Sequence, residues 1–293
     1  MIFPMNTALW MMGTLASFSL MAIAARELSG AIDTFQILFF RSLLGLVIIS
    51  LLILAKKDLS LFSTSRPKQH IIRNLTHFGG QYGWFLGLSL LPLATVFALE
   101  FTVPLWTAII AAIFLKERLT FKKVSAILLG LMAVAIIVNP GNELFDYSSF
   151  IVLAAAIFYA LAYVSSKSLT NTEHPMTMLF YMCLIQLPMG LALTILNWHT
   201  PDLIQWGWLL LVGTTALTAH YCIARAMQLS EVSIVVTLDF LRLPLIALVG
   251  IVFYAEDFQI SIIVGGALML LGNLINTPPR LITKKINKIR ETT

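Results

Sequence analysis

Ten long apolar blocks, separated by short polar connectors, run through the whole chain. A helix needs about 20 mostly apolar residues to cross a hydrocarbon core of about 30 Å, and each block has about that length. The sequence therefore predicts an all-α integral membrane protein with ten transmembrane helices and no inserted soluble domain. The predicted spans cover 7–25, 35–55, 71–91, 95–115, 121–139, 149–168, 177–196, 205–225, 233–253 and 260–277.

The composition excludes a soluble globular protein. Charged residues make up 11% of the chain and hydrophobic residues 59%, whereas soluble domains carry about 25% charged residues. The basic residues lie in short clusters between the apolar blocks, which is typical of membrane topology and not of a nucleic-acid-binding patch. Cys183 and Cys222 lie inside apolar blocks, so the sequence predicts neither a disulfide framework nor a metal site. No Lys or Arg precedes the first block, which we interpret as a retained helix and not a cleaved signal peptide.

Lys and Arg residues in the connectors predict the orientation. Sixteen lie on the side that holds both termini, and only Arg26 lies on the other side. Positively charged connectors stay in the cytoplasm. We therefore expect a multi-pass protein of the inner (plasma) membrane with both termini in the cytoplasm and a basic tail near anionic lipid.

The two halves of the chain resemble each other when one is shifted by 139 residues. The shift aligns two acids within apolar spans, Glu100 with Asp239, while Pro104 and Pro244 miss alignment by one position. It also aligns Tyr82 with Tyr221, Phe101 with Phe240, and Glu117 with Glu256. The prediction is a first repeat over 1–140, a second over 141–278 and a tail over 279–293. Five spans per repeat is an odd number, so the second repeat must be inverted, which is characteristic of secondary transporters.

Four short runs carry a resemblance to a known family: LLPLAT at 90–95, FALEF at 97–101, PLW at 104–106 and LKERLT at 115–120. They resemble the EamA branch of the drug/metabolite transporter superfamily, and a weaker copy lies between Leu229 and Phe258. Where that family has Gly before the acidic residue, this chain has Lys116 in the first half and Ala255 in the second. The resemblance covers nearly the whole chain. It implies a ten-helix bundle whose central cavity is lined mainly by spans 1, 3, 4, 6, 8 and 9, and a transported amino acid, vitamin or drug-like metabolite.

Four side chains inside the spans carry an obligate charge: Arg41, Glu100, Asp239 and Arg242. A charge at the bilayer centre costs about 3 kcal/mol on insertion scales, so such groups usually face a cavity or a partner. Depth along the helices predicts an outer Arg41–Glu100 pair and an inner cluster of His220, Asp239 and Arg242. Static ion pairs that fix helix packing are the alternative, and Arg41 could simply extend to the interface.

Two prolines lie beside the paired acids. Proline has no N–H, so Pro104 and Pro244 each free a helical carbonyl four residues earlier. Freed carbonyls at membrane depth are tolerated where they face protein or water. We therefore assign Pro104 and Pro244, with Arg41, to gating or ion pairing.

The third and sixth predicted spans supply polar and aromatic candidates. Gly79, Gly83 and Gly87 recur every four residues, a pattern that favours close helix packing. His77 is interpreted as a packed or interfacial histidine. The predicted substrate-binding residues are Glu100, Asp239, Arg242, Gln81, Tyr82, Trp84, Tyr159, Tyr163 and His220.

These features favour a secondary transporter of small organic metabolites that works by alternating access. Proton coupling through Glu100 or Asp239 and uncoupled exchange both remain open. The alternative is a non-transporting receptor or complex subunit with a packed helix bundle and no cavity. No catalytic constellation, metal-ligand spacing or phosphate-binding loop is present, so we expect neither an enzyme nor a cofactor.

Overall fold

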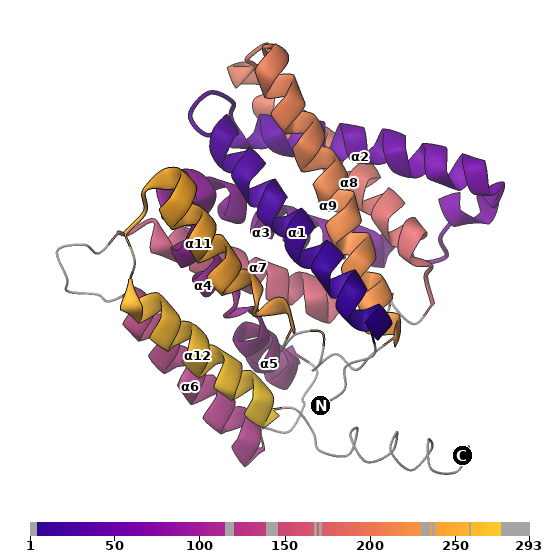
Figure 1. Ribbon diagram of the computed structural model, residues 1–293. Helices are drawn as coiled ribbons and strands as arrows, with labels where there is room; N and C mark the ends of the chain where they lie inside the picture. The colour runs from indigo at the N-terminus through magenta and orange to yellow at the C-terminus, as the bar shows by residue number, and fades with distance from the viewer. Residues whose placement is uncertain are drawn as a thin grey trace.

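The computed structural model describes residues 5–114, 120–138, 146–166, 169, 172–229, 235, 238–257 and 259–276, and within these ranges the chain is helical with no strand. Figure 1 shows the helices gathered into one bundle. The first half contains α1 (Met5–Leu28), α2 (Thr34–Lys56), η1 (Leu59–Phe62), α3 (Pro67–Leu90), α4 (Leu93–Glu100), α5 (Val103–Phe114) and α6 (Phe121–Val138). The second half contains α7 (Ser149–Ser166), α8 (Pro175–Thr194), η2 (Ile195–Asn197), α9 (Leu203–Leu229), α11 (Arg242–Tyr254) and α12 (Ile260–Asn276).

Local chemistry explains several helix ends. The Asp33 side chain accepts the Phe35 N–H and caps α2, while Pro67 and Pro175 occupy first-turn positions where no N–H is needed. His174 caps α8 because its Nδ1 accepts the Met176 N–H at 3.1 Å. Burial, with the nearby Lys56 charge, lowers the pKa of His174, and the neutral ring is the form that can accept this bond.

Five segments within the described residues are long and apolar enough to cross a membrane: Asn6–Leu28, Thr34–Lys56, Leu93–Ile110, Pro175–Thr194 and Leu203–Ala226. Shorter apolar helices cover Ser149–Ser165, Arg242–Tyr254 and Ile260–Ile275. The helical membrane architecture is therefore confirmed, whereas the count of ten spans stays a prediction. Although α3 has 24 residues, it is less apolar, because its turns carry His70, Asn74, His77 and Gln81.

Helices of the first half pack mainly on helices of the second half. The main pairs are α1 with α9, α3 with α7, α2 with α8, α6 with α12 and α4 with α11; Figure 1 shows α1 beside α9 and α6 beside α12. In the repeat α1 corresponds to α7 and α3 to α9, so exchanging the halves converts the α1–α9 pair into the α7–α3 pair. The other pairs join corresponding spans. This is the contact pattern that two-fold related repeats produce.

Matching helix breaks interrupt the fourth and ninth predicted spans. Turns at Phe101–Thr102 separate α4 from α5, and turns at Phe240–Leu241 precede α11. These positions are related by the 139-residue shift. Pro104 and Pro244 lie in the first turn of the helices that follow, where the missing N–H leaves no helical bond unmade. The prediction that each proline frees a carbonyl within a continuous helix is therefore wrong, and the Phe240 carbonyl accepts the Leu243 N–H at 3.1 Å.

The glycines of α3 lie against α7. A Cβ atom at Gly83 would lie 2.9 Å from the Ala155 Cβ, and one at Gly87 would lie 2.4 Å from the Val152 Cγ2. At Gly79 the nearest atom would belong to the Phe158 ring, at 3.1 Å. The close helix packing that the glycine spacing predicts is therefore confirmed, and the structure identifies α7 as the partner helix.

Candidate functional site

A charged triad, formed by Glu100, Asp239 and Arg242, joins the two halves of the chain. Arg242 Nη2 donates to Asp239 Oδ2 at 2.9 Å and to Glu100 Oε1 at 3.3 Å. Glu100 is the last residue of α4, Arg242 is the first of α11, and Asp239 lies three residues earlier. The prediction of two separate clusters at different depths is therefore wrong, because one guanidinium reaches both carboxylates.

Aromatic rings enclose the Arg242 guanidinium. Its Cζ lies 4.6 Å from the ring centroid of Phe18, 5.1 Å from that of Phe97 and 5.2 Å from that of Phe101, all within cation–π range. The triad is largely buried, with exposed side-chain fractions of 3% for Arg242, 18% for Glu100 and 15% for Asp239.

Several polar atoms of the triad have no hydrogen-bond partner. These buried atoms are Arg242 Nε, Arg242 Nη1 and Asp239 Oδ1. Buried polar atoms are paired in most proteins, so a cluster of unpaired ones at the meeting of two helix breaks marks a candidate binding site.

Trp84 and Gln81, one turn apart on α3, contact different charges. Trp84 Nε1 donates to Glu100 Oε2 at 2.8 Å. With the Gln81 amide oriented so that its oxygen faces α2, this oxygen accepts from Arg41 Nη1 and Nη2 at 2.7 and 2.8 Å, and its nitrogen donates to Gln186 Oε1 at 2.8 Å. The predicted Arg41–Glu100 pair is therefore wrong: Arg41 contacts an amide, and Arg242 takes the place beside Glu100.

His220 also lies apart from Asp239. Its ring packs 5.7 Å from Phe18 and 5.6 Å from His77, measured between ring centroids. The predicted cluster of His220 with Asp239 is wrong, although Phe18 contacts both His220 and Arg242 and so places His220 beside the triad. His77 is buried and lies 3.1 Å from the Gln186 amide nitrogen, which agrees with a packed histidine.

The three predicted tyrosines occupy different surroundings. Tyr159 lies 5.5 Å from the His77 ring and interacts electrostatically with both Arg41 and Glu100. Tyr163 is 54% exposed and interacts electrostatically with Glu100 and Asp239. Tyr82 instead stacks on Phe35 at 4.2 Å, at the start of α2, so it is not part of the group around the triad.

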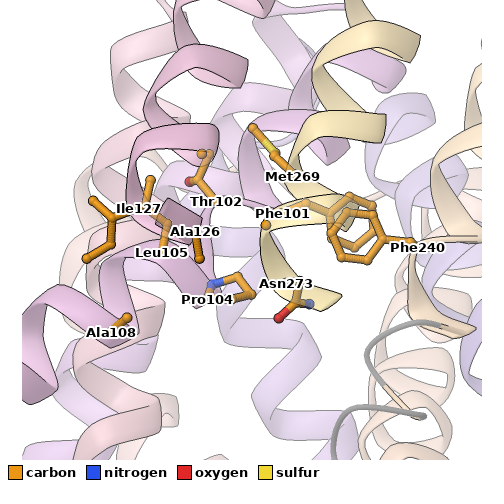
Figure 2. Close-up of a pocket in the computed structure, with 12 residues that line it drawn as sticks. Phe101, Thr102, Pro104, Leu105, Ala108, Ala126, Ile127, Phe240, Met269 and Asn273 are labelled. Carbon is orange, nitrogen blue, oxygen red and sulfur yellow. The ribbon is translucent and has the colours of Figure 1, made fainter. Parts of the chain in front are cut away.

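Corresponding rings of the two repeats meet beside the triad. Phe101 and Phe240 stack with centroids 4.4 Å apart and planes 16° apart. Figure 2 shows the two rings overlapping at the edge of a pocket near Pro104 and Asn273. This pocket, between α5, α6 and α12, has a volume of about 30 Å³ and is not lined by Glu100, Asp239 or Arg242.

A second polar group, which we call the latch, consists of Arg26, Leu91, Leu93 and Glu256. Arg26 Nη2 donates to Glu256 Oε1 at 2.8 Å and to the Leu91 carbonyl at 2.6 Å. The Leu93 N–H, at the start of α4, donates to both Glu256 oxygens at 2.9 Å. The latch thus joins the end of α1, the turn between α3 and α4, and the end of α11.

Sequence reasoning missed the latch, the aromatic rings around Arg242, and Gln186. Gln186 had a usable signal, since it is an amide in the middle of an apolar span. The phenylalanines had none, because Phe occurs throughout such helices. Glu117, which aligns with Glu256, and Lys116 lie outside the described residues. Among the described residues no group of three His, Cys, Asp or Glu side chains could hold a metal ion.

The chain is similar in sequence to several proteins named as transporters. The S-adenosylmethionine uptake transporter of Rickettsia bellii is 25% identical over 280 residues, which cover 94% of this chain and 96% of the relative. The riboflavin transporter of Vibrio cholerae is 29% identical over 256 residues, or 84% of each chain. The pseudopaline exporter CntI of Pseudomonas aeruginosa is 27% identical over 263 residues, covering 87% of this chain and 90% of the exporter.

A protein of known crystal structure shares the fold, with a TM-score of 0.66 over 94% of this chain and 97% of its own, at 20% identity. The EamA-like transporter family matches this chain twice, over residues 5–139 and 147–277. These two matches cover nearly all of the sequence. The chain is therefore a multi-pass membrane protein and not an enzyme, and it belongs to the EamA-like transporter family.

Proposed function

We propose that this protein is a secondary transporter that carries a small organic metabolite across the inner membrane by alternating access. One observation carries the proposal: at matching helix breaks, side chains from both halves form a single buried charged triad. In transporters built from inverted repeats, the substrate site lies near the midplane where broken helices of the two repeats meet. Rocking one half against the other would expose such a site to each side in turn.

The proposal includes ten spans in two inverted repeats, over 1–140 and 141–278, with a basic tail over 279–293. The two family matches fall within these repeats, and the exchange-symmetric helix pairs support them. The 16-to-1 distribution of basic residues supports cytoplasmic termini. In this proposed orientation the latch lies on the outer side, where Arg26 is the single exception to the charge bias and is bound by Glu256.

The proposed substrate is a metabolite of the size that the relatives carry, such as S-adenosylmethionine or riboflavin. It would lie against the triad, with Trp84, Tyr159 and Tyr163 beside it and Gln81 and His220 at the margin. Two buried carboxylates near one guanidinium suit a substrate with hydrogen-bond donors or a positive group.

Transport into proteoliposomes tests the proposal. The purified protein is reconstituted and the uptake of radiolabelled S-adenosylmethionine, riboflavin and the common amino acids is measured, with and without an imposed pH gradient. Uptake that depends on the protein and falls in Glu100→Gln and Asp239→Asn supports the proposal. Lys56→Gln, at the exposed end of α2, is the control and should transport normally.

The same experiment separates the mechanisms. Uptake that follows the pH gradient supports proton coupling, whereas uptake that needs a preloaded metabolite supports exchange. Full transport with unchanged pH dependence in both acid variants would remove the acids from the mechanism. Ligand binding without transport of any compound in the panel would instead favour a receptor or complex subunit.

A further inference from the structure

Arg41 is a buried cation with no acidic partner. It lies on α2, its exposed fraction is 3%, and within the described part of the chain no carboxylate pairs with it. Its Nε has no hydrogen-bond partner. A charge at membrane depth is costly unless a counter-charge or a functional role compensates it. Among the described residues, no ion pair supplies that compensation.

Neutral amides hold Arg41 in place. Its two terminal nitrogens donate to the Gln81 oxygen, and the Gln81 nitrogen donates in turn to Gln186. Gln186 continues the network to the carbonyl of Asn74 at 3.3 Å and to the His77 ring at 3.1 Å. These groups orient the guanidinium without neutralising it. The Nε of Arg41 has no hydrogen-bond partner within this network.

The charged triad has the opposite imbalance. Two carboxylates, Glu100 and Asp239, share one guanidinium, which leaves one negative charge in excess when both acids are ionised. The triad and Arg41 are neighbours along α3, because Trp84 binds Glu100 and Gln81 binds Arg41. Three residues of helix correspond to about 4.5 Å along the axis. Tyr159 packs 5.5 Å from the His77 ring, which belongs to the same amide network as Arg41.

Depth along the helices agrees with this arrangement. Arg41 lies seven residues after the start of α2 at Thr34, and Glu100 lies seven residues after the start of α4 at Leu93. At 1.5 Å per residue, both lie about 10 Å inside the same end of the bundle.

We propose that Arg41 is the carboxylate-binding subsite of the transporter and that the substrate is a zwitterion of the amino-acid type. The substrate carboxylate binds the Arg41 guanidinium, its cationic group binds the excess negative charge of Glu100 and Asp239, and its body lies against Trp84 and Tyr159. This inference rests on the proposed transport function. The positive charge of Arg41 matches the charge of a carboxylate.

Matched ligand pairs test the inference on the wild-type protein. Dissociation constants are measured for S-adenosylmethionine and the common amino acids, and for the amine that each becomes when the carboxylate is removed. Riboflavin, which is uncharged and has no carboxylate, is the neutral comparison. We expect at least one carboxylate compound to bind about tenfold or more tightly than its decarboxylated partner, as expected for a charge-assisted bidentate contact.

Variants of Arg41 then assign the preference to this residue. Arg41→Gln should abolish the difference in affinity between a zwitterion and its decarboxylated amine. Arg41→Lys should retain part of this difference, because lysine keeps the positive charge but cannot form the bidentate contact. Lys56→Gln removes a positive charge from the same helix at an exposed position and should keep the full difference. If Arg41→Gln does not fold, the Arg41→Lys variant and the wild-type ligand pairs still test whether the carboxylate preference depends on Arg41.

Three results would overturn the inference: no carboxylate compound in the panel preferred over its amine, riboflavin as the tightest ligand, or a carboxylate preference that survives in Arg41→Gln. Each can occur while the protein still transports. Transport of riboflavin, for example, would leave the proposed function intact and remove only the zwitterion. If the wild-type protein transports none of the compounds, that result would count against the proposed function instead.

Discussion

At the scale of single residues, Arg242 supplies the one positive charge that two buried acids, Glu100 and Asp239, share. Breaking a buried ion pair by removing one partner costs about 3–5 kcal/mol, because an uncompensated charge stays buried. Arg242→Gln leaves Glu100 and Asp239 without a cation, so it should lower the melting temperature of the detergent-solubilised protein strongly. Asp239→Asn keeps a neutral Glu100–Arg242 pair and should lower it much less.

The test is whether Arg242→Gln lowers the melting temperature more than Asp239→Asn does. Melting temperatures of Arg242→Gln, Asp239→Asn and the exposed control Lys56→Gln are compared in one detergent. Equal losses in Arg242→Gln and Asp239→Asn would contradict a shared guanidinium and indicate that each acid has its own compensation.

Ala255 holds a backbone conformation that suits glycine. It ends α11 with a φ of 50°, in the left-handed region, where a residue other than glycine costs about 1–2 kcal/mol. Ala255→Gly should therefore raise the melting temperature, with a gain in stability of about 1 kcal/mol. The family resemblance places Gly at this position, and the turn explains why: it aims the next residue, Glu256, at the start of α4.

A glycine inside the same helix is the control for Ala255→Gly. Ala247→Gly in α11 should lower stability by about 1 kcal/mol, because glycine is a poor helix former. A lower melting temperature for Ala255→Gly would show that the left-handed turn is not strained.

The residues of the site were partly predictable from the sequence. Glu100, Asp239 and Arg242 stand out because obligate charges inside apolar spans need an explanation. Their partners could not be derived, because depth along a helix fixes neither the rotation of the helix nor which helix of the other half lies beside it. Arg41 and Glu100 lie at equal depth and yet do not pair, since Gln81 and Trp84 of α3 bind them separately.

At the scale of elements, the glycines of α3 set its distance from α7. An added Cβ at Gly83 would meet the Ala155 Cβ at 2.9 Å and the Ile151 carbonyl oxygen at 3.1 Å. Because a backbone atom cannot move aside cheaply, Gly83→Ala should separate the helices and destabilise the protein by about 1–3 kcal/mol. Melting temperature and transport rate should both fall.

Gly207 on α9 offers a matched control, because an added Cβ there has nothing within 4 Å. Gly207→Ala should be neutral or stabilising by up to about 1 kcal/mol, owing to the better helix propensity of alanine. If Gly83→Ala were as stable as Gly207→Ala, close packing of α3 on α7 would not matter for stability.

The elements themselves follow from simple sequence signals. Apolar runs of helical length give the helices, and the two prolines place the breaks of the fourth and ninth spans within a few residues. The sequence does not show which helices pair, because any two apolar faces can pack. The exchange-symmetric pairs become visible only in the assembled bundle.

At the scale of the whole molecule, the two halves meet at two levels. At the helix breaks the triad joins α4 to α11, and at the proposed outer face the latch joins α1, the α3–α4 turn and the end of α11. A closed latch on one side is what alternating access requires of a state whose site faces the other side. The latch is therefore the element whose loss should bias the equilibrium between the two states.

Breaking the latch should favour opening at the outer face. The Arg26–Glu256 contact is partly buried and shares Glu256 with the backbone of Leu93, so its removal should shift the equilibrium by about 1–3 kcal/mol, or roughly 5- to 150-fold. Spin labels at Ala31→Cys and Asp257→Cys, in a background with Cys183→Ala and Cys222→Ala, report the separation of the ends of α1 and α11. Arg26→Gln should populate longer distances, and Lys56→Gln should not. An unchanged distance distribution in Arg26→Gln would show that the Arg26–Glu256 contact stabilises both states equally. A latch that forms in only one state must change the populations of the two states when it is removed, so this outcome would rule out a gating role.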